Sequence, residues 1–343
     1  MITTASTAPD ATDPYAVHHL IIGSEADAKA GRVVWDPVHS LWNGAMLIGA
    51  AAAPFLFSWS GLAMFIGLTG ATLLLGHSVG FHRRLIHDSF QAPRWLDYSL
   101  MWIGTLVGMS GPLWMIKAHD TRDWGQRQGR CHPYLSNRAG FWRDYWWNLH
   151  GRLELDHPPI FSPAPNIASD RFYTLLEQTW MLQQAPLALA LFMLGGWSWL
   201  VWGVCMRIWI SVTGHWLVGR VAHRSGPQHW LVEGAGIQAH DVPWAAIPTM
   251  GEAWHNNHHA YPASARLGLY PGQSDWGFAF IRLLQRLGLA WNVRTPENLP
   301  HRHALAPASS RRDRLVQTAL GETSRSGMKA TPRSAHGRPW WPC

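Results

Sequence analysis

Charged side chains are scarce in this chain of 343 residues. Asp, Glu, Lys and Arg together make up 14% of it, against about 25% in a typical soluble domain. Tryptophan is abundant, with 23 residues, and tryptophan is enriched where membrane proteins meet the lipid–water boundary. Because the mean hydropathy is only −0.09, we expect a membrane protein with a substantial polar part outside the bilayer.

Cysteine is also scarce. Cys131, Cys205 and Cys343 are scattered and form no CxxC pair, which argues against a disulfide framework, an iron–sulfur cluster and a structural zinc site. The chain also lacks a glycine-rich dinucleotide fingerprint and an HPGG haem motif. Lys and Arg exceed Asp and Glu by seven, but no nucleic-acid-binding motif surrounds them, so we expect no nucleic-acid partner.

Long apolar runs are few and come in two pairs, separated by short turns at Ser60-Gly61 and Gly195-Gly196. As a helix, each run can cross or nearly cross about 30 Å of hydrocarbon. Neither turn contains Lys or Arg, whereas the long segments 76–184 and 219–343 are rich in both. The positive-inside rule therefore places both termini in the cytoplasm. We predict an all-α integral membrane protein with four transmembrane helices in two hairpins. The predicted spans are 41–59, 62–81, 179–195 and 197–218.

The remaining segments are assigned from composition. Residues 1–34 are small and polar and are expected to be mobile, residues 35–300 form the membrane domain, and residues 301–343 form a basic disordered tail. The apolar segment 100–116 is interrupted by glycine and proline and is interpreted as an interfacial or re-entrant helix. Arg207 lies inside the last apolar run and is expected to face protein or water, because a charge in lipid is costly.

Histidine numbers 20, and its densest group is the HNNHH run with His255, His258 and His259. Positions i, i+3 and i+4 lie on one face of a helix, with Cβ atoms about 5–6 Å apart. Imidazoles this close, with no acid between them, would repel each other if charged. They make sense as neutral ligands to a metal.

Three smaller groups follow the predicted spans or lie between them. His82 and His87 are five residues apart, which is about 140° on a regular helix, so they converge only beside a bend or on two metals. His119 and Asp123 are four apart and share a helix face. His223 follows the last apolar run.

All these groups fall at or beyond the cytoplasmic end of a predicted span, so a bundle of the four helices would gather them in a helical cap over one membrane face. Seven histidines and one carboxylate are too many for one ion with six positions, and they fit two. The candidate ligands are His82, His87, His119, Asp123, His223, His255, His258 and His259. His77 lies within a predicted span and is assigned to packing or to support of a ligand.

The ligand types indicate the chemistry. Nitrogen-rich ligation without thiolates and with open positions is typical of non-haem iron that takes up O₂. Two irons can gather the electrons needed to attack an unactivated methylene group. Metals placed beside lipid suggest that the substrate is a hydrocarbon chain.

With these histidine motifs, the sequence resembles the membrane fatty acid desaturase family, and within it the acyl-CoA desaturases. That family carries an HxxxxH box, an HxxHH box, a lone histidine after the last span and a final HxxHH box. The resemblance covers roughly residues 35–297. The matching stretches are 76–90 (GHSVGFHRRLIHDSF), 118–124, 215–223 (HWLVGRVAH), 251–262 (GEAWHNNHHAYP) and 286–293 (RLGLAWNV).

The resemblance implies a function. It implies O₂-dependent insertion of a cis double bond into a fatty acyl chain, most readily an acyl-CoA, at two iron ions. It also implies a membrane lipid environment and a separate electron donor, which is a ferredoxin, a rubredoxin or a cytochrome with its reductase. Gln126, Arg127 and other basic residues of 117–152 are candidates for binding the CoA phosphates.

The chain departs from the family pattern at two places. Where the second box has two adjacent histidines, this chain has Arg122 and Asp123. Arginine offers no lone pair to a metal, so the expected set is one ligand short, and water or His132 would complete it. Gly219 stands where the family commonly has an asparagine that holds a metal-bound water.

Three alternatives stay open from the sequence. A di-iron hydroxylase of lipids or alkanes would use the same cap, with oxygen retained in the product. A membrane zinc hydrolase would need one ion and no reductant. A non-catalytic lipid-binding relative would carry a decayed site, with Arg122 as its record.

Overall fold

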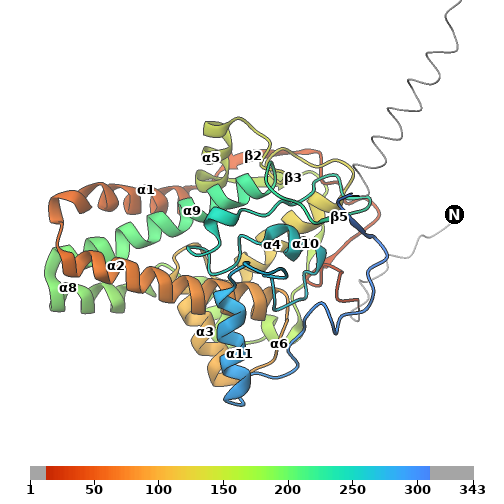
Figure 1. Ribbon diagram of the computed structural model, residues 1–343. Helices are drawn as coiled ribbons and strands as arrows, with labels where there is room; N and C mark the ends of the chain where they lie inside the picture. The colour runs from red at the N-terminus through yellow and green to blue at the C-terminus, as the bar shows by residue number, and fades with distance from the viewer. Residues whose placement is uncertain (1–12, 310–343) are drawn as a thin grey trace, which may run out of the picture.

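The computed structural model describes residues 13–309, and this part of the chain is mostly helical (Figure 1). Residues 1–12 of the expected mobile segment and 310–343 of the expected tail lie outside the described residues. The helices outside the two apolar hairpins are α3 (Arg94–Leu106), α4 (Pro112–Arg127), α5 (Phe141–His150), α6 (Pro165–Ala168), α7 (Arg171–Thr179), η4 (Pro243–Ala245), α10 (His255–Ala260) and α11 (Trp276–Arg286).

Two apolar hairpins lie side by side and extend to one end of the molecule (Figure 1). Their segments are α1 (Pro37–Ala52), η1 (Ala53–Leu56), α2 (Trp59–Ala71) and η2 (Thr72–Ile86), then α8 (Gln184–Leu200), η3 (Val201–Met206) and α9 (Arg207–Ala222). Asp36 begins α1 by accepting hydrogen bonds from the backbone of Val38 and His39. Gly196 bends the second hairpin, with φ of 61°, inside α8.

Two continuous helical stretches are long and apolar enough to cross a membrane, Trp59–Ile86 and Gln184–Ala222. Only 22% of the residues in the most apolar window of each are buried. An apolar helix that keeps most of its side chains on the outside differs from the core helix of a soluble protein and suits contact with lipid. The second stretch includes the bend at Gly196, so it is a hairpin rather than one straight helix.

The turns of the two hairpins contact each other. The hydroxyl oxygens of Ser58 and Ser198 are 2.7 Å apart, and the indole N–H of Trp199 donates to Ser60. Trp202 donates to the backbone carbonyl of Ala53 at 3.1 Å. These bonds join the two turns at the end of the molecule farthest from α4 and α10 (Figure 1).

The apolar segment 100–116 forms parts of two helices, because the chain turns at 107–111 between α3 and α4. A Cβ on Gly76 would lie 2.6 Å from the backbone of Ile103 and Gly104, so glycine lets η2 and α3 pack backbone to backbone. As expected, Arg207 faces protein. It is fully buried and donates to the carbonyl oxygens of Gly203 and Leu106 and to the Gln184 side chain.

Three short antiparallel sheets, which the all-α expectation missed, complete the fold. Their strand pairs are β1 (Leu20–Ile21) with β4 (Ile160–Phe161), β2 (Gly31–Trp35) with β3 (Gly151–Leu155), and β5 (Trp230–Val232) with β6 (Leu305–Pro307). Residues 13–34, expected to be mobile, therefore contain β1 and part of β2, and the expected tail begins with β6. Pairing with strands more than 70 residues away satisfies the backbone hydrogen bonds of both terminal segments. No local sequence pattern predicts this pairing.

Candidate metal centre

Seven histidines converge at the end of the hairpins opposite to their turns, in two groups. Within each group, one ring nitrogen from every histidine lies within 4.8 Å of the others. The four-histidine group consists of His82, His87, His119 and His258, and the three-histidine group consists of His223, His255 and His259. These residues come from η2, α4, α9 and α10, or directly follow them.

The winding of η2 explains how His82 and His87 meet. The segment is a π-helix, and the N–H of His87 donates to the carbonyl of His82 at 3.2 Å. An i→i+5 bond brings residues five positions apart to the same side of the helix, and the two ring centroids are 4.8 Å apart. The separation of about 140° on a regular helix therefore does not apply to this segment, and of the two expected alternatives, a bend or two metals, the irregular winding brings both residues into one group.

The short helix α10 serves both groups. His255 and His259 are one helical turn apart, with ring centroids 4.5 Å apart, and both face His223. His258 points instead to His82, at a centroid distance of 4.5 Å. The rings of His255 and His258 are 5.6 Å apart, so the two groups adjoin each other.

Electrostatics favour the neutral form of six of these rings. His119 is the exception, because Asp123 and Asp120 outweigh its burial and raise its pKa. Burial lowers the pKa of His87, His223, His258 and His259, and the neighbouring imidazoles lower it further. Burial also lowers the pKa of His255 to about 4. Both ring nitrogens of His258 are buried without a hydrogen-bond partner, which is costly unless something binds them. A neutral, nitrogen-only set of donors fits a transition metal.

Asp123 is buried beside the two groups and belongs to neither of them. Burial opposes its charge, but His119, Arg127 and His87 outweigh this and hold its pKa far below the ordinary value. Arg127 donates to Asp123 at 3.3 Å. The carboxylate is therefore ionised, with one oxygen shared with an arginine.

Arg122 points away from the histidines. Its guanidinium donates to the side chains of Asn137 and Asn148, at 2.8 Å each, and to the carbonyl oxygens of Tyr134 and Leu135. It ties α4 to the following loop and to α5. The position where the family has a ligand thus has a structural role in this chain.

His132, expected as a substitute ligand, belongs to neither histidine group of the described chain. It accepts a hydrogen bond from the backbone of Tyr134 and lies against Trp147. Gln126 is buried and donates to Leu135, and Arg127 is bonded to Asp123 and to the carbonyl of Tyr15. Gln126 is therefore poorly placed for the expected phosphate contact.

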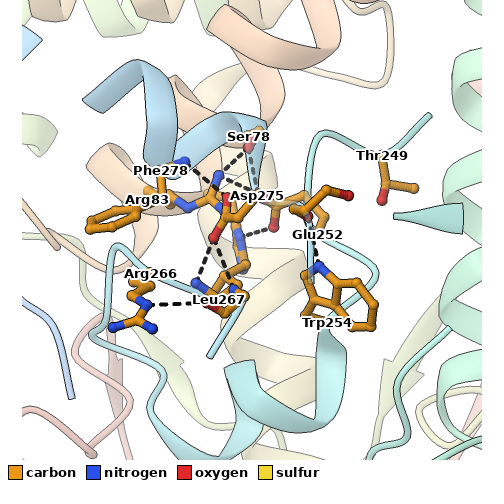
Figure 2. A network of polar contacts seen from close by, with 12 residues as sticks. Ser78, Arg83, Thr249, Glu252, Trp254, Arg266, Leu267, Asp275 and Phe278 are labelled. Atoms are coloured by element: carbon orange, nitrogen blue, oxygen red, sulfur yellow. Dashed lines mark hydrogen bonds and ion pairs between the residues drawn. The ribbon is translucent and has the colours of Figure 1, made fainter. Parts of the chain in front are cut away.

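A buried polar network supports His82, and the analysis of the sequence missed it. Glu252 contacts the Nδ1 of His82 and accepts from Ser78. Figure 2 shows Arg83 between Ser78, Glu252 and Asp275, and Arg83 lies 2.8 Å from each carboxylate. The signal was present in the Gly-Glu flank of the last box, but the partners of Glu252 lie 169 to 174 residues before it in the chain.

Two other carboxylates lie near the histidine groups. Asp120 contacts the rings of His119, at 3.4 Å, and of His19, at 3.1 Å, and these contacts lower its pKa to about 2 despite its burial. Asp241 accepts from the backbone of Asn256 at the start of α10. His77, expected in packing or support, lies with its ring centroid 4.9 Å from that of His215.

A polar cleft of about 620 Å³ opens beside the three-histidine group. It is lined by His223 together with Arg138, Arg224, Gln228 and His240, among others. A second cavity holds about 10 Å³, room for about one water, between Arg127, His259 and Arg302.

Comparison with known proteins supplies independent evidence, although no family model matches the chain. The chain is 35% identical over 248 residues to an sn-2 palmitoyl-lipid 9-desaturase of Nostoc sp. (strain 36), covering 71% of this chain and 85% of that protein. It is 36% identical over 281 residues to an sn-1 stearoyl-lipid 9-desaturase of Anabaena variabilis, covering 78% and 97%. It is 31% identical over 290 residues to an acyl-CoA 5-desaturase of Anemone leveillei, covering 80% and 86%.

Proposed function

This chain belongs to the membrane fatty acid desaturase family, and we propose that it inserts a cis double bond into a fatty acyl chain at a centre of two iron ions. It is an oxidoreductase that acts on fatty acids. The observation that carries the iron proposal is the convergence of seven histidines into two adjoining groups at one end of apolar helices.

The donor set supports iron. Imidazole nitrogen with a nearby carboxylate and no thiolate is the ligation of O₂-using non-haem iron. When bound, the irons would supply the four-electron reduction of O₂ to water, using two electrons from the donor and two from the C–H bonds of adjacent methylenes. The protein's own part is to hold neutral imidazoles, orient His82 through Glu252 and orient His119 through Asp120.

We propose four spans with both termini and the metal centre in the cytoplasm. The two uncharged turns meet at one end, and α4 and α10, which carry histidines of the two groups, lie at the other (Figure 1). Exposed aromatic residues mark the turn end, with Trp59 and Trp197 exposed by 78% and 61%, as in the aromatic belt of a membrane protein.

The substrate class and electron donor are also proposals. Relatives are named as desaturases of lipid-bound chains and of acyl-CoA, and the acyl-CoA expectation stands beside the lipid one. A separate donor, a ferredoxin, a rubredoxin or a cytochrome with its reductase, would supply the electrons.

The test is expression of the full chain in a host that lacks unsaturated fatty acids, followed by gas chromatography and mass spectrometry of its lipids. A new alkene, two mass units below the saturated chain, supports the proposal. A gain of oxygen points to the hydroxylase, O₂-independent hydrolysis with one zinc per chain points to the hydrolase, and no product with a competent reductant points to a lipid-binding relative. Purified enzyme given acyl-CoA or phospholipid distinguishes the head groups.

A further inference from the structure

The two histidine groups differ in the number of donors. One offers four imidazoles and the other three. We propose that the two metal positions are unequal: the four-histidine group retains its ion, while the three-histidine group binds its ion weakly and exchanges it with solvent. This inference rests on the proposed function, because it takes the two groups as the two iron positions.

The three-histidine group cannot gain a fourth metal donor from position 122 or from position 219. Arg122 is held by four hydrogen bonds to the loop at 134–137 and to Asn148, and its guanidinium offers no lone pair. Gly219 lies one turn before His223 on α9, and a Cβ there would meet no atom within 4 Å. Position 219 therefore contributes no side-chain donor to this group, although there is space for one.

The supporting residues are also unequal. Carboxylates contact His82 and His119 of the four-histidine group, through Glu252 and Asp120, and a carboxylate partner raises the basicity of a ligating imidazole. In the three-histidine group, the Nδ1 of His223 lies 2.7 Å from the neutral carbonyl of Gly219.

Arginines act on both groups, but Arg83, which acts on His82 of the four-histidine group, is paired with the carboxylates of Glu252 and Asp275. Arg122 acts on His223 and His255, and Arg127 and Arg302 act on His259. Arg302 also donates to the carbonyl of His259 at the end of α10. Repulsion from these guanidinium groups opposes a bound cation, and Asp123 offsets it only in part because it is shared with Arg127.

Solvent access favours exchange at the same group. His223 lines the 620 Å³ cleft, and His255 and His259 are both partly exposed. In the four-histidine group, His258 and His82 are buried, with exposures of 1% and 8%, and His119 is partly exposed, but no histidine of this group lines the cleft. A chelator or a competing ion therefore reaches the three-histidine group first.

The experiment loads the detergent-solubilised full chain with Fe²⁺ under anaerobic conditions and dialyses it against graded EDTA. Iron per chain is then measured by elemental analysis. We expect two steps of iron loss, separated by at least about tenfold in chelator concentration, since even an outer partner of a ligand changes metal affinity about 10–100-fold. His259→Ala removes the easily lost step and leaves one retained ion.

Two variants at Gly219 form a matched pair. Gly219→Asn adds an amide oxygen on the helix face of His223 and moves the easily lost step toward tighter retention, whereas Gly219→Ala, which adds only a methyl group, leaves it unchanged. Simultaneous loss of both ions from the unmodified chain, or loss of the tightly held ion in His259→Ala, overturns the inference. Iron retention is independent of product formation, so an inactive protein with two unequal ions would refute the proposed function and leave this inference standing.

Discussion

The support of His82 by Glu252 gives the sharpest prediction. Replacement of Glu252 by glutamine keeps the size of the side chain and an oxygen that can accept from Ser78. It removes the negative charge that Arg83 and the ring of His82 contact. Arg83 is only 1% exposed, so water cannot replace the lost partner.

The expected magnitude follows from what remains. Asp275 still lies 2.8 Å from the guanidinium of Arg83, so the arginine keeps one of its two carboxylates. The loss is then that of one charge-assisted hydrogen bond, about 1.5–3 kcal/mol of unfolding free energy. Glu252→Ala, which also removes the acceptor, should cost about 3–5 kcal/mol, as for a broken buried pair. Iron in the four-histidine group should bind about 10–100-fold more weakly, as when an outer partner of a metal ligand is lost.

The assays are denaturant unfolding in detergent, followed by tryptophan fluorescence, and iron retention against EDTA. Glu154→Gln is the matched control, because Glu154 is partly exposed and lies 3.5 Å from Arg32 and 3.0 Å from Arg152 in surface pairs. Such pairs contribute about 0–1 kcal/mol. If Glu252→Gln unfolds and releases iron like Glu154→Gln, the network does not support the site.

Three further predictions concern other parts of the molecule. Asp123→Ala should reduce the yield of unsaturated product at least about tenfold, on the scale of a lost ligand partner, and an unchanged lipid profile would show that this carboxylate is not needed. Arg207→Ala leaves the buried amide oxygen of Gln184 without its donor, while the carbonyl of Leu106 keeps the Gln184 amide as a donor, and should lower the unfolding free energy by about 1–3 kcal/mol; equal stability to the unmodified chain would contradict this. Burial raises the pKa of Asp241 from 3.8 to about 6, so the stability from its protonated form is complete below pH 3.8 and is lost as the pH rises through 6. The free energy of unfolding of Asp241→Asn, measured relative to the unmodified chain, should therefore increase between pH 4 and pH 7, and a flat difference would refute the assignment.

Local patterns in the sequence were sufficient for the apolar hairpins and for the choice of histidines. An apolar run of this length must satisfy its backbone internally, which makes a helix the only local solution in lipid. The turn at Gly195-Gly196 was predicted because it separates two apolar runs, and the structure has a φ of 61° at Gly196, which glycine tolerates. The HNNHH run was placed on one helix face from its spacing alone, and α10 is helical there.

The distribution of those histidines required the tertiary structure. On α10, the side chain of His258 points in a different direction from those of His255 and His259. Which histidines each of them meets depends on how η2 and α9 pack against α10. The π-helical winding that brings His82 and His87 together could not be predicted from the sequence either. Residue spacing does not reveal which carbonyl accepts each backbone N–H.

The sequence by itself therefore determined the class of protein, the apolar hairpins and the seven histidines that converge, since these depend on composition and on spacing within one element. Tertiary structure decided the grouping of four and three histidines, the support of His82 by Glu252, and the pairing of β1 and β6 with distant strands. These contacts join residues from separate elements and depend on how whole elements pack, and no short segment of the chain carries that information.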